Sequence, residues 1–63
     1  MPIVTVQMWT GRTSAEKKAL TRAIADAMVQ HARAKPETLN IIIQEVPKEN
    51  WTVGRVTDDE KTS

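Results

Sequence analysis

The chain has no cysteine and a single histidine among its 63 residues. Without cysteine it can form neither a disulfide framework nor a thiolate metal site, and one histidine is too few for a histidine metal cluster. A chain this short buries only about 60% of the surface that its unfolded form exposes. We therefore expect no metal and no cofactor, and we expect association between subunits to supply stability.

An excess of one charge and a long apolar run are also missing. Nine basic and eight acidic residues give a formal net charge of +1, and the two signs are interspersed. This balance leaves no basic stripe for nucleic acid. No stretch resembles a membrane span or a secretory leader. We expect a cytoplasmic protein without a nucleic-acid or membrane partner.

Residues 3–9 show the alternation of a β-strand. One face carries Val4, Val6 and Met8, and the other carries Ile3, Thr5, Gln7 and Trp9. The first face is strongly apolar and the second partly so. This strand therefore requires cover on both faces.

A helix is predicted over residues 14–33, because Thr13 and Glu16 stand at the spacing of a capping box. Its expected apolar stripe consists of Leu20, Ile24, Ala27, Met28 and His31. His31 is interpreted as a structural residue near the helix C-terminus. One stripe can cover only one face of a sheet.

A second strand is predicted over residues 38–46, after Pro36 has ended the helix. Strand, helix and strand form a βαβ unit of the α/β (α+β) class with two parallel strands. Residues 51–56 suit a short strand or hairpin arm. We expect one domain over residues 1–56 and a solvated polar tail over residues 57–63. The sheet face without a helix predicts a homo-oligomer.

Pro2 follows Met1 directly. Cellular processing usually removes an initiator methionine when the next residue is this small, and the new terminus would be the secondary amine of Pro2. A neutral amine can act as a base or a nucleophile. The Met-Pro pair alone has little specificity, because many proteins begin this way.

Together, four features of the chain resemble the small 4-oxalocrotonate tautomerase family. They are the Met-Pro-Ile start, Gly11-Arg12 after the first strand, the isoleucine-rich second strand, and the run EVPKENW at residues 45–51. The resemblance implies dimers of βαβ subunits, three of which form a hexamer. It also implies an isomerase that interconverts the enol and keto forms of an unsaturated 2-hydroxy or 2-keto acid.

The resemblance also assigns site residues. Pro2 matches the catalytic general base, Arg12 a substrate-binding arginine and Trp51 the aromatic residue of the site. Asn40 stands where the family has a second arginine, and it supplies no charge. Arg55 replaces a glycine and is a candidate to provide the missing cation. All four residues other than Pro2 are expected to bind substrate.

Two related activities fit less well. Val53 stands where the dehalogenases of the superfamily have an acidic residue, and Thr38 where the malonate semialdehyde decarboxylases have their aspartate. Tautomerisation is therefore the expected reaction. Pro2 and Arg12 flank the first strand, roughly 30 Å apart at about 3.3 Å per residue. A site that uses both must be shared between subunits.

Two other classes of function remain open. A non-catalytic oligomeric scaffold or ligand-binding protein would have the same fold with Met1 retained. A ribbon-helix-helix DNA-binding protein also begins with a strand and a helix. That class requires a second long helix where this chain has the β-branched residues 38–46.

Overall fold

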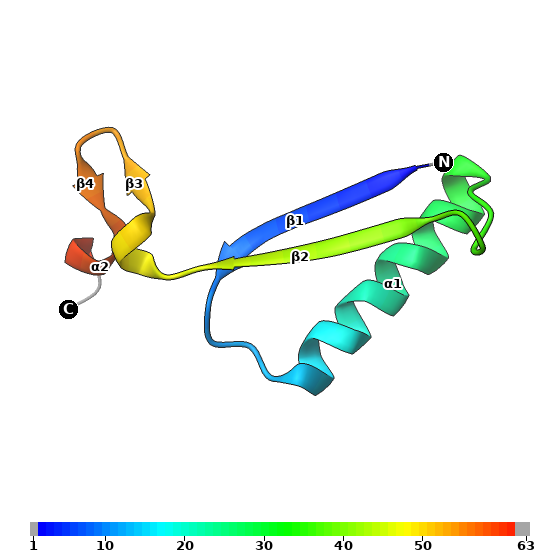
Figure 1. Ribbon diagram of the computed structural model, residues 1–63, viewed down its shortest axis with the longest axis horizontal. Coiled ribbons are helices and arrows are strands. Elements are labelled where there is room, and N and C mark those ends of the chain that lie inside the picture. Colours follow the sequence, from blue (N-terminus) through cyan, green and yellow to red (C-terminus); the bar gives the residue numbers. More distant parts are fainter. Residues whose placement is uncertain (1, 62–63) are drawn as a thin grey trace.

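The structure, a computed structural model, describes residues 2–61. Along this part of the chain the elements are β1 (Ile3–Trp9), α1 (Ser14–Ala32), β2 (Asn40–Val46), the 3₁₀ turn η1 (Lys48–Asn50), β3 (Thr52–Val53), β4 (Val56–Thr57) and α2 (Asp58–Lys61). The predicted βαβ unit is confirmed, and β1 and β2 are parallel (Figure 1). Their pairing begins with Ile3 opposite Asn40 and ends with Trp9 opposite Val46.

The second strand begins two residues later than predicted. The backbone N–H groups of Thr38 and Leu39 both donate to the carbonyl of Lys35, at 3.0 and 3.1 Å. This turn follows from Pro36 and leaves no partner strand for the two residues. The ladder therefore starts at Asn40, whose N–H donates to the Pro2 carbonyl at 3.0 Å.

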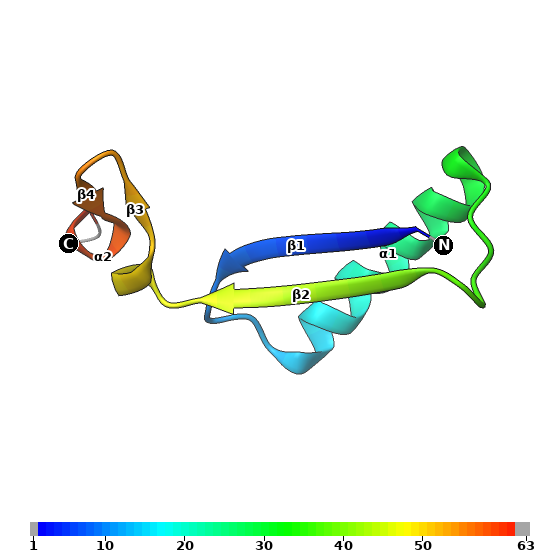
Figure 2. The ribbon, with the colours of Figure 1, turned by 45° about the horizontal axis from the view of Figure 1, so that its top comes forward.

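Helix α1 covers one face of the two-stranded sheet (Figure 2). The side chains that the sheet turns toward it are half-buried: Val4, Val6, Met8, Ile41 and Ile43. On the opposite face Ile3 is 61% and Ile42 is 48% exposed. The predicted difference between the two faces of the first strand is confirmed.

The start of α1 is the predicted capping box. The Thr13 hydroxyl accepts the Glu16 N–H at 3.1 Å, and the Glu16 carboxylate accepts the Thr13 N–H at 2.8 Å. The helix ends at Ala32, one residue earlier than predicted, because Arg33 takes a left-handed conformation with φ 57°. A residue in that conformation commonly terminates a helix.

Two of the five residues in the predicted apolar stripe of α1 need correction. Leu20, Ile24 and Met28 are half-buried against the sheet, whereas Ala27 and His31 are exposed. A single helix on two strands covers only a narrow strip. Ala27 lies on the flank of that strip and His31 in the last turn, so neither is covered within the subunit.

Residues 48–61, here called the C-terminal arm, contain η1, β3, β4 and α2 and extend beyond the end of the sheet (Figures 1 and 2). The expected hairpin is confirmed, with β3 antiparallel to β4. Its two-residue loop has a positive φ of 67° at Gly54. A positive φ at the first loop residue alone is the pattern of a type II′ turn, which suits glycine.

The expectation of a solvated tail from residue 57 is wrong for the first two positions. Thr57 belongs to β4, and Asp58 begins α2 with only 5% of its surface exposed. Asp58 is buried because it packs against the tryptophans described below. Residues 62 and 63 lie outside the described residues, and where the domain ends stays a prediction.

The subunit has very little interior of its own. Among residues 2–60, Ala34 and Asp58 are the two buried residues, and no side chain is completely enclosed. The described part of the chain measures 41 × 25 × 15 Å. The bare face of the sheet leaves the large apolar side chains of Ile3 and Ile42 in contact with solvent.

Candidate active site

Pro2 and Asn40 are neighbours at one end of the sheet. Pro2 is half-buried just before β1, and its carbonyl accepts the Asn40 N–H. The Asn40 side chain is exposed, and its amide Nδ2 donates to the Thr38 carbonyl at 3.3 Å. Two of the predicted site residues therefore meet within one subunit. Met1 lies outside the described residues.

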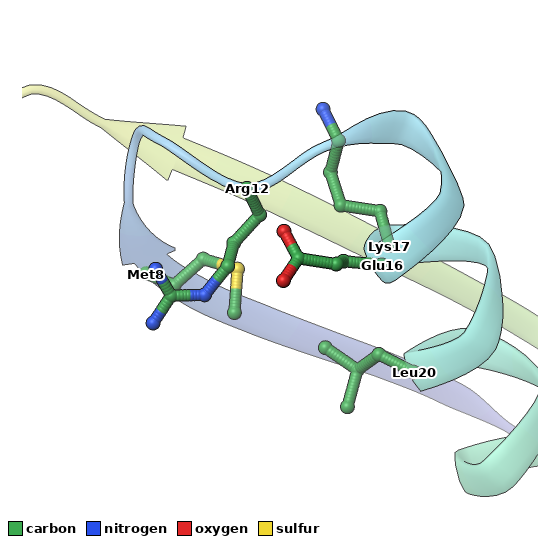
Figure 3. A pocket seen from close by; sticks show the side chains of 5 residues that line it. All are labelled: Met8, Arg12, Glu16, Lys17 and Leu20. Carbon is green, nitrogen blue, oxygen red and sulfur yellow. The ribbon is translucent and has the colours of Figure 1, made fainter.

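Arg12 lies at the other end of β1, in the loop that leads into α1. It lines a pocket of ≈ 260 Å³ together with Met8, Glu16, Lys17 and Leu20. Figure 3 shows the Arg12 guanidinium beside the Met8 side chain, with the Glu16 carboxylate directed toward the same space from the helix. The pocket combines the forked cation of Arg12 and the carboxylate of Glu16 with an apolar floor of Met8 and Leu20.

Two carboxylates hold the Arg12 loop in place. Lys17 donates to Glu45 of β2 at 2.7 Å, and this hydrogen bond is the main cause of the lowered pKa of Glu45, against an opposing effect of burial. The nearby Gly11 backbone N–H lowers the pKa of this carboxylate further. Glu45 thus ties the loop to both β2 and α1.

Glu16 stabilises the loop from the helix side. Its pKa is lowered chiefly by the hydrogen bond from the Thr13 backbone, then by the Thr13 side chain, and also by the nearby charge of Arg12. The capping box therefore does more than start the helix. It places an anionic group next to the predicted substrate-binding arginine.

Trp51 and Arg55 belong to the C-terminal arm. Trp51 is half-buried between η1 and β3, and Arg55 is exposed in the hairpin loop after Gly54. The Trp51 ring makes an edge-to-face contact with Trp9, the last residue of β1, with ring centroids 6.5 Å apart. Both arm residues therefore lie beyond the end of the sheet at which the Arg12 loop begins.

The predicted site residues fall into two groups. Pro2 and Asn40 lie where the sheet begins, whereas Arg12, Trp51 and Arg55 lie where β1 ends or beyond it (Figure 1). The seven residues of β1 alone span about 23 Å at 3.3 Å per residue. A single subunit does not bring the two groups together.

Three neighbours of Trp51 were not predicted as site residues: Trp9, Lys48 and Asp58. Trp9 Nε1 donates to Asp58 Oδ2 at 2.8 Å, and Lys48 Nζ lies 4.4 Å from the Trp9 ring centroid. Trp9 and Asp58 are separated by 49 positions, so no local spacing connects them. The one sequence feature that could have indicated this cluster was Trp9, a large aromatic residue at the end of the first strand and on its less apolar face.

Within residues 2–61, no group of three or more histidine, cysteine, aspartate or glutamate side chains is arranged to hold a metal ion. Over the same part of the chain, no helix has both the length and the apolar character needed to cross a membrane. The groups that Arg12, Arg55, Asn40 and Trp51 offer are guanidinium groups, an amide and an indole ring.

Comparison with known proteins consistently finds tautomerases. The family model of the tautomerase enzymes matches residues 2–59. The chain is 40% identical over 60 residues to a 2-hydroxymuconate tautomerase of Pseudomonas putida, covering 95% of each chain. It is also 39% identical over 54 residues to a probable tautomerase of Bacillus cereus, covering 86% of this chain and 88% of that protein.

Solved structures agree with the sequence matches. A 4-oxalocrotonate tautomerase isozyme from Methylibium petroleiphilum superposes with a TM-score of 0.88 at 31% identity, covering 98% of this chain and 100% of the other. A heterohexameric 4-oxalocrotonate tautomerase from Chloroflexus aurantiacus gives a TM-score of 0.86 at 33% identity, covering 95% and 97%. Sequence and fold together place this chain in the tautomerase family, among the 4-oxalocrotonate tautomerase homologues.

Proposed function

We propose that this protein is an isomerase that interconverts the enol and keto forms of an unsaturated 2-hydroxy or 2-keto acid. The proposed general base is the amine of Pro2, released when Met1 is removed. The observation that carries the proposal is the placement of Pro2 at the head of β1 in a chain 40% identical to a 2-hydroxymuconate tautomerase.

The proposed reaction is a proton transfer without net gain or loss of atoms. The neutral Pro2 amine accepts the hydroxyl proton of the enol and returns a proton to carbon, as a 1,3- or 1,5-shift along the conjugated system. No oxidant or reductant takes part. General-base catalysis of this kind contributes about 10²–10⁴-fold in rate.

The base must be largely unprotonated near neutral pH. An ordinary α-amine has a pKa of about 7.7–8.0, and a proline amine is intrinsically more basic. Apolar surroundings and a neighbouring cation both disfavour the ammonium form. Pro2 is half-buried in its own subunit, and an Arg12 from another subunit would provide the cation.

The same geometry supports a site assembled from more than one subunit. Pro2 and Arg12 lie at opposite ends of β1, and the outer sheet face exposes Ile3 and Ile42. Covering this face would bury the apolar surface that a single subunit leaves in solvent. We infer a homo-oligomer, namely a hexamer of three dimers. A relative from Chloroflexus aurantiacus is a heterohexamer.

Each remaining residue then has a distinct proposed role. The forked Arg12 guanidinium binds the substrate carboxylate. Trp51 covers the apolar part of the substrate and excludes water. The Asn40 amide, next to Pro2, can hydrogen-bond a carbonyl or carboxyl oxygen without neutralising it. Arg55, exposed in the hairpin loop, is available to a second carboxylate.

The test combines mass spectrometry of the N-terminus with assays on phenylenolpyruvate and 2-hydroxymuconate. The processed protein should convert enol to keto acid, and Pro2→Ala should lower kcat/KM by about 10²–10⁴-fold. A protein that retains Met1 and is fully active would overturn the role of Pro2. A processed oligomer that converts neither substrate would instead favour a non-catalytic ligand-binding or scaffold protein.

A further inference from the structure

Four residues form one connected cluster where β1 meets the C-terminal arm. They are Trp9, Lys48, Trp51 and Asp58, here called the tryptophan clasp. Asp58 contacts both tryptophans. Its Oδ2 accepts the Trp9 Nε1–H at 2.8 Å, and its backbone N–H donates to the Trp51 carbonyl at 2.7 Å. With 5% exposure, Asp58 is the buried polar residue of the described chain.

Lys48, the first residue of η1, makes the same two kinds of contact. Its ammonium lies 4.4 Å from the Trp9 ring centroid, and its carbonyl accepts the Trp51 N–H at 3.1 Å. Asp58 and Lys48 therefore each hold Trp9 by a side chain and Trp51 by the backbone. The two rings meet at 79° with centroids 6.5 Å apart, a favourable edge-to-face arrangement.

These contacts fix Trp9 without burying it. A buried carboxylate is costly unless it is hydrogen-bonded, so the Trp9 bond matters to Asp58 as well as to the indole. A cation over the ring adds a further attraction. Trp9 nevertheless keeps 39% of its surface exposed. An indole held in one orientation, yet partly open, is preorganised to receive a flat apolar group.

The clasp lies at the end of β1 that leads into the Arg12 loop. Trp9 precedes Arg12 by three residues, and Trp51 also lines a hollow of ≈ 250 Å³ with Gln7 and Val46. A neighbouring subunit that brings its Pro2 to Arg12 and Trp51 therefore also brings it near Trp9. Beside Pro2 stands the uncharged Asn40, whose side chain brings no positive charge to a second carboxylate.

We propose that Trp9 is a specificity-determining residue, that Asp58 is the residue that positions it, and that the preferred substrates are enol acids with one carboxylate and a planar aryl substituent. This inference rests on the proposed tautomerase function and goes beyond it by naming the substrate class. Arg12 binds the carboxylate, and the aryl group lies against the wall that Trp9 and Trp51 form.

The kinetic test compares phenylenolpyruvate with 2-hydroxybut-2-enoate, in which a methyl group replaces the phenyl group. Trp9→Leu should lower kcat/KM for the aryl substrate about tenfold more than for the methyl substrate, mainly through KM. Asp58→Ala should act in the same direction, whereas Asp58→Asn, which keeps an oxygen acceptor, should restore most of the preference. Glu60→Ala removes an exposed carboxylate from the same short helix and is the matched control.

A spectroscopic test reports on Trp9 itself. The chain has two tryptophans, so Trp51→Phe leaves Trp9 as the single indole fluorophore. In this background Asp58→Ala should shift the Trp9 emission to longer wavelength, because the indole loses its buried partner, and Asp58→Asn should not. Phenylpyruvate should change the emission at a lower concentration than pyruvate, and Asp58→Ala should weaken that preference about tenfold.

The outcomes separate this inference from the proposed function. Equal losses on aryl and methyl substrates in Trp9→Leu, or equal binding of phenylpyruvate and pyruvate, would overturn the aryl specificity. An unchanged Trp9 emission in Asp58→Ala would overturn the positioning role. Absence of turnover in the processed wild-type protein would overturn the tautomerase function, and the fluorescence titrations would still decide whether the clasp selects aryl groups.

Discussion

Asn40 is the residue at which this chain departs most clearly from the family pattern that its sequence resembles. Its backbone has a structural role, because it starts the ladder between β1 and β2 by donating to the Pro2 carbonyl at 3.0 Å. Its exposed side chain is an amide where a guanidinium is expected. The backbone role is open to most residues, so the side chain can be changed without disturbing the strand.

We predict that Asn40→Arg improves a diacid selectively. A charge-assisted hydrogen bond to a carboxylate is worth about 1.5–3 kcal/mol, or roughly ten- to 150-fold in kcat/KM. The gain should appear with 2-hydroxymuconate and not with phenylenolpyruvate. Gln30→Arg, which adds the same charge at an exposed helix position, should change neither.

Arg55 provides the complementary measurement. If its guanidinium takes the place of the second arginine, Arg55→Ala should lower kcat/KM for 2-hydroxymuconate by a similar factor and leave phenylenolpyruvate almost unchanged. Equal changes for both substrates in Asn40→Arg and in Arg55→Ala would mean that neither position contacts the second carboxylate.

At the scale of elements, the loop between β1 and α1 is fixed from two sides. The capping box closes it at the helix, and at its other end the Thr10 N–H donates to the Val46 carbonyl of β2 at 3.2 Å. Glu45 of β2 also accepts from Lys17 at the start of the helix. The proposed substrate-binding arginine, Arg12, thus lies on a short loop whose ends are both hydrogen-bonded. Such preorganisation reduces the entropy lost when Arg12 binds a carboxylate.

The Glu45 anchor should make stability depend on pH. Because the folded state lowers the pKa of Glu45, its contribution is complete above the ordinary glutamate pKa of about 4.3 and disappears as the pH falls through the lower folded value. Glu45→Gln should therefore melt below the wild-type Tm at pH 7, and the difference should shrink as the pH falls below the ordinary glutamate pKa of about 4.3.

Thermal melts by circular dichroism, at one protein concentration and at half-unit steps from pH 7 to pH 3, would measure this effect. Glu37→Gln removes an exposed carboxylate from the turn after α1 and is the matched control. A difference between wild type and Glu45→Gln that stays constant over the whole range would show that the carboxylate charge contributes nothing to the anchor.

At the scale of the whole molecule, the subunit is an incomplete structure. Among the described residues almost none is buried, and one face of the sheet is bare. The same arrangement separates the proposed base from the proposed arginine by the length of β1 (Figure 1). In the proposed oligomer, stability and the proposed catalytic site therefore depend on the same step, the packing of sheets from different subunits.

Mixing two inactive variants tests this dependence. Pro2→Ala and Arg12→Ala should each be nearly inactive alone, but their co-refolded mixture should regain activity. If Pro2 and Arg12 of a site come from different subunits, an equal mixture contains roughly a quarter of intact sites. If both came from one subunit, no hybrid site would be intact, and the mixture would stay inactive. Each variant refolded alone is the control.

The local elements could be predicted from the sequence because short-range physics determines them. The alternation in residues 3–9, the capping box at Thr13 and Glu16, and the turn at Pro36 each involve neighbours within a few positions. The limits of the helix stripe were less predictable. Whether Ala27 and His31 are covered depends on the width and length of the sheet beneath the helix. The spacing of apolar residues along the helix carries no information about those dimensions.

The residues of the candidate site likewise divide into those that the sequence could predict and those that only the structure revealed. Pro2 and Arg12 were identified from motifs that are contiguous in the sequence, whereas the clasp depends on Trp9 and Asp58, which are 49 positions apart. An aspartate in an acidic segment looks solvated until the chain turns back through β3 and β4 and places it against an indole N–H. The sequence by itself determined the βαβ unit, because hydrophobic period and caps act locally. Only the tertiary structure decided which polar residue is buried, because burial depends on what the folded chain packs against it.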